Sequence, residues 1–365
     1  MCLKTPSPEL LEEEKQIQVT INNYIDEFKH IKFNAGAGAG KTHALKESLL
    51  YIVNKYGMKL KYHNQQILCI TYTNVATNEI KERIGNSSLV KVSTIHERIW
   101  ELIKDYQKEL VQIHQEKVSN ELIETQATLN NPDIVKYKKF QDLDEANQET
   151  LRQILLDNRE LYYKNKDKNA ATFKTAFQGI VDSSMMSNVG QFKDIIKAIY
   201  KISNYQICLT KIDTKEYKTV VYDSKQNTDS LHRMKVSHET LLEYGLKIVD
   251  KYDTLKKIII NKFPYILIDE YQDTNPIQAK ILNELDKNNN SCIIGDPYQS
   301  IYRFLGASVK NIMNKAKLDG MNTIQLVKNY RSTPNIVAFT NDIAKQFNER
   351  IQNHIPCESA ALGLN

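Results

Sequence analysis

Four short apolar runs stand out along the chain, and each of them ends at small or acidic residues. They span residues 31–34, 67–71, 265–268 and 292–294. Short apolar runs that end in turn residues are typical of parallel strands buried on both faces. Residues 75–84 and 276–285, which follow two of these runs, have the composition of helices. This alternation predicts an α/β fold, in which ligands bind at the carboxyl ends of the strands.

The middle of the chain has a different pattern. Residues 99–163 are rich in charge and favour long helices, whereas residues 217–222 predict one isolated strand. Ser237 is a suitable N-cap for a further helix, because its side-chain oxygen can accept from the first turn. We therefore predict a mainly helical insertion. The predicted domains are an α/β domain at residues 1–100 and 256–306, and the insertion at residues 101–255.

Size and composition are those of a globular protein. The chain has 365 residues, of which 41% are hydrophobic and 25% are charged. At roughly 100–200 residues per domain, this length allows two or three domains with sizeable cores. The net charge of +5 permits a nucleic acid as partner but does not require one.

The sequence gives no sign of a membrane span, a signal peptide or a zinc site. No apolar run approaches the roughly 18–20 residues of a membrane-spanning helix, and residues 1–15 lack the apolar core of a signal peptide. The 5 cysteines form no C-x-x-C pair, so neither a disulfide framework nor a zinc ribbon is supported. We expect reduced thiols in a cytoplasmic protein with no membrane partner.

The strongest chemical signal is the segment 35–42, with the sequence Ala-Gly-Ala-Gly-Ala-Gly-Lys-Thr. It fits the phosphate-binding pattern G-x-x-x-x-G-K-[ST], except that Ala35 replaces the first glycine. Its glycines are Gly36, Gly38 and Gly40. They let backbone N–H groups surround phosphates, while Lys41 would reach the β- and γ-phosphates and Thr42 would hold Mg²⁺. The alternative, a flexible Gly/Ala turn, does not explain the terminal Lys-Thr between a strand and a helix.

A second signal is the apolar run 266–268, which ends in Asp269 and Glu270. A Mg²⁺-dependent nucleotidase needs such carboxylates: Asp269 would lie in the shell of the metal, and Glu270 would orient and deprotonate the attacking water. Taken alone, an Asp-Glu pair after a strand is usually a solvated turn. Its combination with Lys41 makes the prediction specific, and the helical insertion accounts for the long separation in sequence.

Longer strings around these residues resemble the motifs of superfamily 1 DNA helicases of the UvrD/Rep/PcrA group. The string 266–274, Ile-Leu-Ile-Asp-Glu-Tyr-Gln-Asp-Thr, resembles motif II. Other blocks follow in the order of the family: Gln16 is similar to the Q-motif glutamine, and segments 70–74, 93–96, 295–302 and 329–333 resemble motifs Ia, Ib, III and IV. The resemblance implies a RecA-like P-loop NTPase domain with a parallel sheet and a helical insertion.

The resemblance stops short of the last motifs of the family. Residues 334–365 follow the motif IV block, and nothing in them resembles motif V or VI. We therefore expect residues 307–365 to be the beginning of a second RecA-like domain that is incomplete. Truncation and completion by another chain are both open explanations.

The resemblance also implies roles for individual residues toward ATP and Mg²⁺. Gln16 would hydrogen-bond the adenine and Tyr330 would stack on it. Gln299 would sense the γ-phosphate and couple it to DNA, and Arg331 would stabilise the charge of the transferring phosphoryl group. The alternative for Gln16 is a solvent-facing position in a charged helix, and that for Arg331 is a surface charge.

Single-stranded or partly duplex DNA is the expected macromolecular partner. By resemblance, Tyr72, Tyr302 and Phe304 would pack against bases, since aromatic stacking tolerates any base sequence. Thr94 and His96 would contact the backbone of the strand. The alternative for each aromatic is packing in a core, which is the usual place of a lone aromatic side chain.

Three functions remain open from the sequence. The first is an ATP-dependent helicase or translocase that couples ATP hydrolysis to movement on DNA or its unwinding. The second is a non-translocating DNA-stimulated ATPase or nucleotide-gated subunit of a larger DNA-processing or phage-defence complex, with a nuclease or another protein as partner. The third is a non-catalytic interaction subunit, which the presence of Lys41, Asp269 and Glu270 argues against.

Overall fold

The computed structural model of the chain forms two compact units. It describes residues 8–85, 87–286, 289–296, 299–300, 307–318, 320–346 and 353–354. The first, here called the sheet unit, contains the described residues up to Ile103 and those from Leu241 onward. The second, here called the helical unit, spans Lys104–Thr240. Each unit has its own core, and the two are considered separately.

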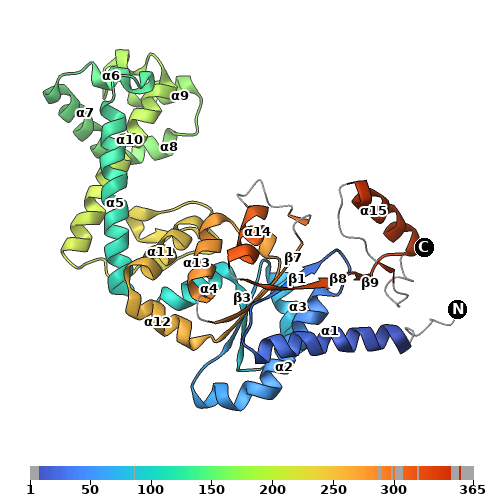
Figure 1. The fold of residues 1–365 in the computed structure, drawn as a ribbon. Helices are drawn as coiled ribbons and strands as arrows, with labels where there is room; N and C mark the ends of the chain where they lie inside the picture. The colour runs from blue at the N-terminus through green and yellow to red at the C-terminus, as the bar shows by residue number, and fades with distance from the viewer. Residues whose placement is uncertain are drawn as a thin grey trace. The chain divides into compact units, whose positions relative to one another are not determined.

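A parallel sheet of six strands organises the sheet unit, as far as the structure describes it (Figure 1). The strands are β1 (Ile31–Ala35), β2 (Ile67–Thr71), β3 (Val90–Thr94), β6 (Tyr265–Ile268), β7 (Asn290–Gly295) and β8 (Asn322–Leu326). Their order across the sheet is β3-β2-β6-β7-β1-β8. Every residue of β2, β6 and β7 is buried, as expected for central strands covered on both faces. The predicted α/β fold with a parallel sheet is therefore confirmed.

Strand β8 lies elsewhere than the sequence predicted. Residues 307–365 were expected to begin a separate second domain, yet β8 pairs with β1, with Phe33 opposite Ile324. The first sheet therefore extends at least to Leu326. The reason for the difference is that β8 is an edge strand with polar residues at 322, 323 and 325, so it lacks the apolar run that identified the central strands.

Helices cover both faces of the sheet. The helices that lie wholly or mostly in the sheet unit are α1 (Pro8–Asp26), α2 (Lys41–Tyr62), α3 (Asn74–Ile84), α4 (Ile95–Ile103), α11 (His238–Lys251), α12 (Asp253–Lys262), α13 (Pro276–Asp286), α14 (Val309–Leu318) and α15 (Pro334–Gln346), of which α15 lies apart from the sheet (Figure 1). Buried side chains of α1, α2 and α3 share one core with Phe33, Cys69 and Leu267 of the strands. This core fixes α2, and with it the loop that precedes α2, against the sheet.

The helical insertion is shorter than predicted. Its expected carboxyl border was residue 255, but the helical unit ends at Thr240. A Cβ added at Gly245 of α11 would lie 2.6 Å from Ile99 Cγ2 of α4, so α11 packs closely within the sheet unit. An amphipathic pattern identifies the buried face of a helix but not the core that this face joins. The border could therefore not be placed from the sequence.

The helical unit is built around two long helices, α5 (Gln107–Asn130) and α10 (Val189–Asp213). Shorter helices complete it: α6 (Lys138–Gln141), α7 (Glu145–Asp157), α8 (Arg159–Asn165) and α9 (Ala170–Phe177). Its core contains Phe140, Phe173, Phe177 and Phe192, all fully buried. The strand predicted at 217–222 is present as β4 (Val221–Tyr222), but it pairs with β5 (Lys235–Val236) rather than being isolated.

Within the described part of the chain, no helix is long and apolar enough to cross a membrane. Cys69, Cys208 and Cys292 are buried and carry free thiols. The same residues contain no cluster of three or more His, Cys, Asp or Glu side chains suited to a metal ion.

Candidate nucleotide-binding site

A glycine loop joins β1 to α2 at the carboxyl edge of the sheet. Gly38 has φ 73° and Gly40 has φ 81°, values in the left-handed region that favours glycine. The N–H of Ala39 donates to the carbonyl of Gly36 at 3.2 Å, which closes the turn. Gly40 then caps α2, a helix of 22 residues. The amino end of this helix faces the loop, which is the arrangement that binds phosphate.

Three predicted site residues meet beside this loop. Lys41 Nζ lies 3.1 Å from Glu270 Oε2 and 3.3 Å from Gln299 Oε1. Lys41 follows β1, Glu270 follows β6, and Gln299 follows β7. Because the strands are parallel, their carboxyl ends share one edge, and that edge collects residues that are distant in sequence.

The backbone at Glu270 is unusual. Glu270 has φ 49° and ψ 45°, a left-handed conformation that is uncommon for a side chain of this size. Its N–H donates to Asp269 Oδ1 at 3.0 Å. A residue held in this region costs of order 1–3 kcal/mol and is retained where the surroundings fix it. The turn aims Glu270 at Lys41.

Asp269 is almost completely buried at the end of β6. Burial and, to a smaller extent, the charge of Glu270 raise the pKa of its carboxyl to about 7, although Lys41 and the N–H of Glu270 act in the opposite direction. Two adjacent carboxylates, one of them buried, favour a cation nearby. A cation bound beside Asp269 would therefore favour the ionised form of this carboxyl.

The residues at this edge fit Mg²⁺ bound together with a nucleotide. Thr42 directly follows Lys41 in α2, and Asp269 directly precedes Glu270. Each is therefore the sequence neighbour of one member of the Lys41–Glu270 ion pair. Hydroxyl and carboxylate oxygens are the protein ligands that Mg²⁺ takes, usually with phosphate oxygens completing the shell. Asp269 and Thr42 can supply such oxygens while Lys41 pairs with a phosphate.

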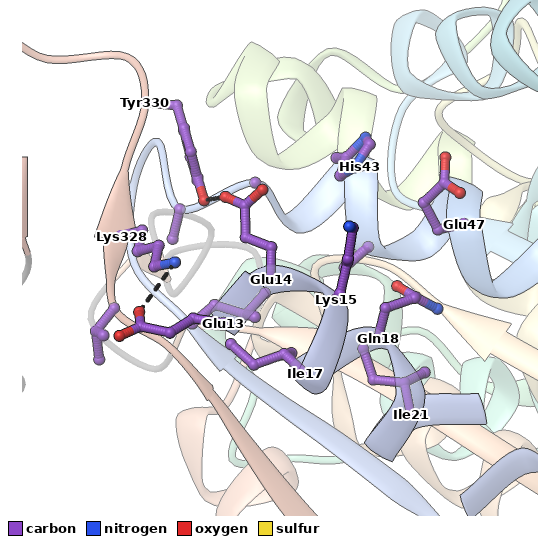
Figure 2. A pocket seen from close by; sticks show the side chains of 15 residues that line it. Glu13, Glu14, Lys15, Ile17, Gln18, Ile21, His43, Glu47, Lys328 and Tyr330 are labelled. Carbon is purple, nitrogen blue, oxygen red and sulfur yellow. Dashed lines mark hydrogen bonds and ion pairs between the residues drawn. The ribbon is translucent and has the colours of Figure 1, made fainter. Parts of the chain in front are cut away.

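A cavity of about 700 Å³ adjoins the glycine loop (Figure 2). Its lining comes from α1, the loop with the start of α2, and the segment from β8 to Tyr330. Tyr330 Oη donates to Glu14 Oε1, and Lys328 Nζ lies 3.2 Å from Glu13 Oε2. A Cβ added at Gly40 would lie 3.6 Å from the Tyr330 ring. The cavity therefore continues the phosphate loop, and an aromatic ring stands beside it.

The structure does not bring Gln16 into this cavity. Gln16 is exposed, whereas Gln18 lines the cavity together with Ile17 and Ile21. At 3.6 residues per turn, two positions along a helix differ by about 200° in direction. Gln18 Nε2 donates to Asn22 Oδ1 at 2.9 Å. The sequence did contain a signal for Gln18, because it lies on the side of Ile17 and Ile21 that faces the core.

The segment predicted as motif IV is hydrogen-bonded to the glycine loop. Asn329 Nδ2 donates to the carbonyl of Ala37 at 3.0 Å, and the N–H of Tyr330 donates to the carbonyl of Gly38 at 2.9 Å. Asn329 Oδ1 accepts from the N–H groups of Arg331 and Ser332. Arg331 is exposed and lies next to Gly38. The structure thus brings Tyr330 and Arg331 to the phosphate loop.

Three residues predicted to contact DNA lie at the same edge of the sheet. Tyr72 follows β2, and Thr94 ends β3, where it is paired with Thr71; His96 is in the first turn of α4. Thr94 Oγ1 also accepts from the N–H of Glu97 at 3.4 Å, so its hydroxyl contributes to the cap of α4. Tyr302 and Phe304 lie outside the described residues.

Comparison with known proteins identifies chains of similar sequence. The model of the UvrD/REP helicase N-terminal domain matches residues 20–318. The chain is 45% identical over 363 residues to Gabija protein GajB of Bacillus cereus, which covers 96% of this chain and 52% of that protein. It is 27% identical to ATP-dependent DNA helicase PcrA of Bacillus subtilis, over 87% of this chain and 37% of that protein. PcrA of Staphylococcus aureus matches at 27% identity, over 87% of this chain and 38% of that protein.

Proposed function

The chain belongs to the UvrD/REP helicase N-terminal domain family, and on this premise we propose that it binds ATP with Mg²⁺ and single-stranded DNA. In this proposal, ATP hydrolysis drives movement along DNA or its unwinding. The observation that carries the proposal is the meeting of Lys41, Glu270 and Gln299 at the ends of three strands. The chain spans about half the length of GajB and less of PcrA, so the activity proposed is that of the motor core.

The chemistry follows from the positions of the side chains. The glycine loop and Lys41 bind the β- and γ-phosphates, and Asp269 and Thr42 hold Mg²⁺, which supplies charge neutralisation when bound. Glu270 accepts the proton of the water that attacks the γ-phosphate. Arg331, next to Gly38, stabilises the negative charge that the transferring group carries.

The DNA contacts would lie on the same edge of the sheet as the ATP site. Tyr72 follows β2, which pairs with β6 on the side away from β1, while Thr94 ends β3, the next strand beyond β2, and His96 comes shortly after it. Because both sites would share this edge, a change at the nucleotide phosphates could reach the bound single-stranded DNA over a short distance. Gln299, in contact with Lys41, is the residue we assign to sensing the γ-phosphate.

A second candidate function is favoured by the 45% identity to Gabija protein GajB. In it, the chain is a DNA-stimulated ATPase or nucleotide-gated subunit of a larger DNA-processing or phage-defence complex. A nuclease or another protein subunit would then be its partner. This candidate uses the same ATP site and differs only in whether hydrolysis moves DNA.

Steady-state ATP hydrolysis with and without single-stranded DNA tests both candidates, with Glu270→Gln as the control. DNA stimulation that disappears in the control, together with strand separation on a partly duplex substrate, supports the motor. Stimulation without strand separation or translocation supports the second candidate. ATP hydrolysis that is equal in the native protein and in the control overturns both.

A further inference from the structure

Gln272 occupies a fully buried position between the two carboxylate-bearing segments of the site. Its Nε2 donates to Glu270 Oε2 at 2.7 Å, and its Oε1 accepts from the N–H of Asp296 at 3.1 Å. Its backbone carbonyl accepts from Ser300 Oγ at 3.2 Å. The orientation of the amide is fixed by these partners, because a flipped amide would face oxygen with oxygen and N–H with N–H.

These contacts belong to a closed circuit of polar interactions. Lys41 Nζ contacts both Glu270 Oε2 and Gln299 Oε1. Gln299 Nε2 donates to Asp296 Oδ2 at 2.7 Å, and the backbone N–H of Asp296 donates to Gln272 Oε1. Gln272 closes the circuit at Glu270. It thereby links the end of β6 to the loop that carries Gln299, without itself touching Lys41 in the described contacts.

Gln272 also packs closely against Gly295, the residue that precedes Asp296. A Cβ added at Gly295 would lie 2.5 Å from Gln272 Oε1 and 2.8 Å from Ile312 Cδ1. Ordinary side chains never approach this closely, so the amide occupies space that any larger residue at 295 would need. Close packing against Gly295 of β7 therefore restricts the Gln272 amide on one side, and its hydrogen bond to Glu270 restricts it on the other.

We propose that Gln272 is a positioning residue for Glu270 in ATP hydrolysis. Lys41 and Gln272 both donate to Oε2, so Oε1 is the oxygen through which Glu270 takes the proton of the attacking water. Gln272 acts through Glu270 and does not contact the nucleotide. This inference rests on the proposed ATPase function and adds to it the residue that sets the direction of the base.

The test replaces Gln272 by methionine, which has a similar volume but neither the donor nor the acceptor. Gln278→Met is the matched control, because Gln278 is also buried and its Oε1 accepts from the N–H of Asn275 at 2.9 Å, outside the circuit. We expect kcat of Gln272→Met to fall about ten- to hundredfold, with ATP affinity within about twofold of native. Gln278→Met should keep the native kcat.

A double-variant cycle separates positioning from general damage. In the Glu270→Gln background, measured under single turnover, Gln272→Met should lower the residual rate no further, because its effect requires the carboxylate. A native kcat in folded Gln272→Met overturns the inference, as does an equal loss in both backgrounds. If the methionine variant does not fold, Gln272→Asn serves instead, since it keeps the amide but is one methylene too short to reach both partners.

The same experiment keeps the two proposals apart. If Glu270→Gln hydrolyses ATP normally, the assignment of Glu270 as the base is wrong, and the proposed mechanism fails with it. If Glu270→Gln is inactive while Gln272→Met has native kcat, the ATPase proposal stands and only the positioning role fails.

Discussion

Lys41 Nζ lies 3.1 Å from Glu270 Oε2, and the two side chains are 11% and 33% exposed. The residues come from different strand ends, so the contact depends on the register of the whole parallel sheet. A phosphate that binds the glycine loop competes with Glu270 for the lysine ammonium. In the proposed mechanism, Lys41 serves nucleotide binding and Glu270 serves hydrolysis, so variants of the two members of this ion pair should have different defects.

Lys41→Ala should impair binding as well as turnover. The variant loses the cation that contacts the phosphates, and a charge-assisted hydrogen bond is worth about 1.5–3 kcal/mol, or roughly ten- to hundredfold in affinity. Turnover should fall by at least about 10²–10³-fold. Titration with a fluorescent ATP analogue and a phosphate-release assay measure the two effects. Near-native turnover would refute the assignment of the phosphate loop.

Glu270→Gln should separate ATP binding from ATP hydrolysis. The amide is nearly the same size as the carboxylate but cannot accept a proton, and a general base contributes about 10²–10⁴-fold to a rate. We expect ATP to bind with about native affinity while hydrolysis almost stops. The same two assays measure this variant, and loss of ATP binding in a folded Glu270→Gln would count against the role as base.

Gln18→Ala and Gln16→Ala form a matched pair on one helix. Gln18 lines the cavity beside the glycine loop and Gln16 does not. If the cavity takes the base of the nucleotide, removal of Gln18 should weaken ATP binding about two- to tenfold, the value of one hydrogen bond. Gln16→Ala should bind ATP as the native protein does. The reverse result would return the base-reading role to Gln16.

Gly38→Ala tests the contact between the glycine loop and the segment that carries Arg331. Its φ of 73° makes alanine costly, and the new Cβ would lie 2.7 Å from Asn329 Oδ1 and 2.9 Å from Arg331 Cβ. Gly179→Ala is the control, because Gly179 has φ 77° with nothing within 4 Å of the added Cβ. Both variants should lose about 1–2 kcal/mol of stability from the backbone alone. We expect only Gly38→Ala to lose ATP turnover, measured beside the melting temperature.

Acid should destabilise the helical unit through His114. This side chain is fully buried, and its Nε2 lies 2.8 Å from the carbonyl oxygen of Leu231. Burial lowers the pKa of His114 below its ordinary value of 6.5. The unfolded chain then binds the proton more readily, so the stabilising contribution is present above about pH 6.5 and is lost as the pH falls below it.

The variant His114→Gln keeps an amide donor for the same carbonyl and removes the titration. Its free energy of unfolding should therefore fall less between pH 8 and pH 5 than that of the native protein. Urea unfolding followed by circular dichroism at several pH values measures the difference. Parallel pH dependences for the two proteins would show that His114 does not contribute.

Much of the site could be predicted because it follows the ends of central strands. The apolar runs before Lys41 and Glu270 indicated parallel strands, and parallel strands bring their carboxyl ends to one edge. The prediction failed at β8, whose polar residues gave no apolar run, and at α11, whose apolar face joins the core of the sheet unit. In both cases the decisive information is which partner an element packs against, and local sequence does not contain it.

Gln18 and Gln272 escaped prediction for different reasons. Gln18 lies two residues after Gln16, the glutamine that the motif suggested. The two side chains leave α1 in different directions, and only Gln18 lines the cavity. Ile17, Ile21 and Ile25 recur at helical spacing and face the core, which would have favoured Gln18. Gln272 lies in the string 266–274 that resembles motif II. Its contact with Asp296, however, joins two segments whose distance is set by the tertiary fold.

The cavity beside the glycine loop is closed by residues that lie far apart along the chain, since Glu14 and Tyr330 are separated by 316 positions. It is complete only when the sheet has assembled from β1 through β8. A nucleotide that occupies it can therefore bind the native state but not a partly folded chain, and by mass action it would raise the melting temperature of the sheet unit with increasing concentration. ATP bound in this cavity would in this way stabilise the folded sheet unit.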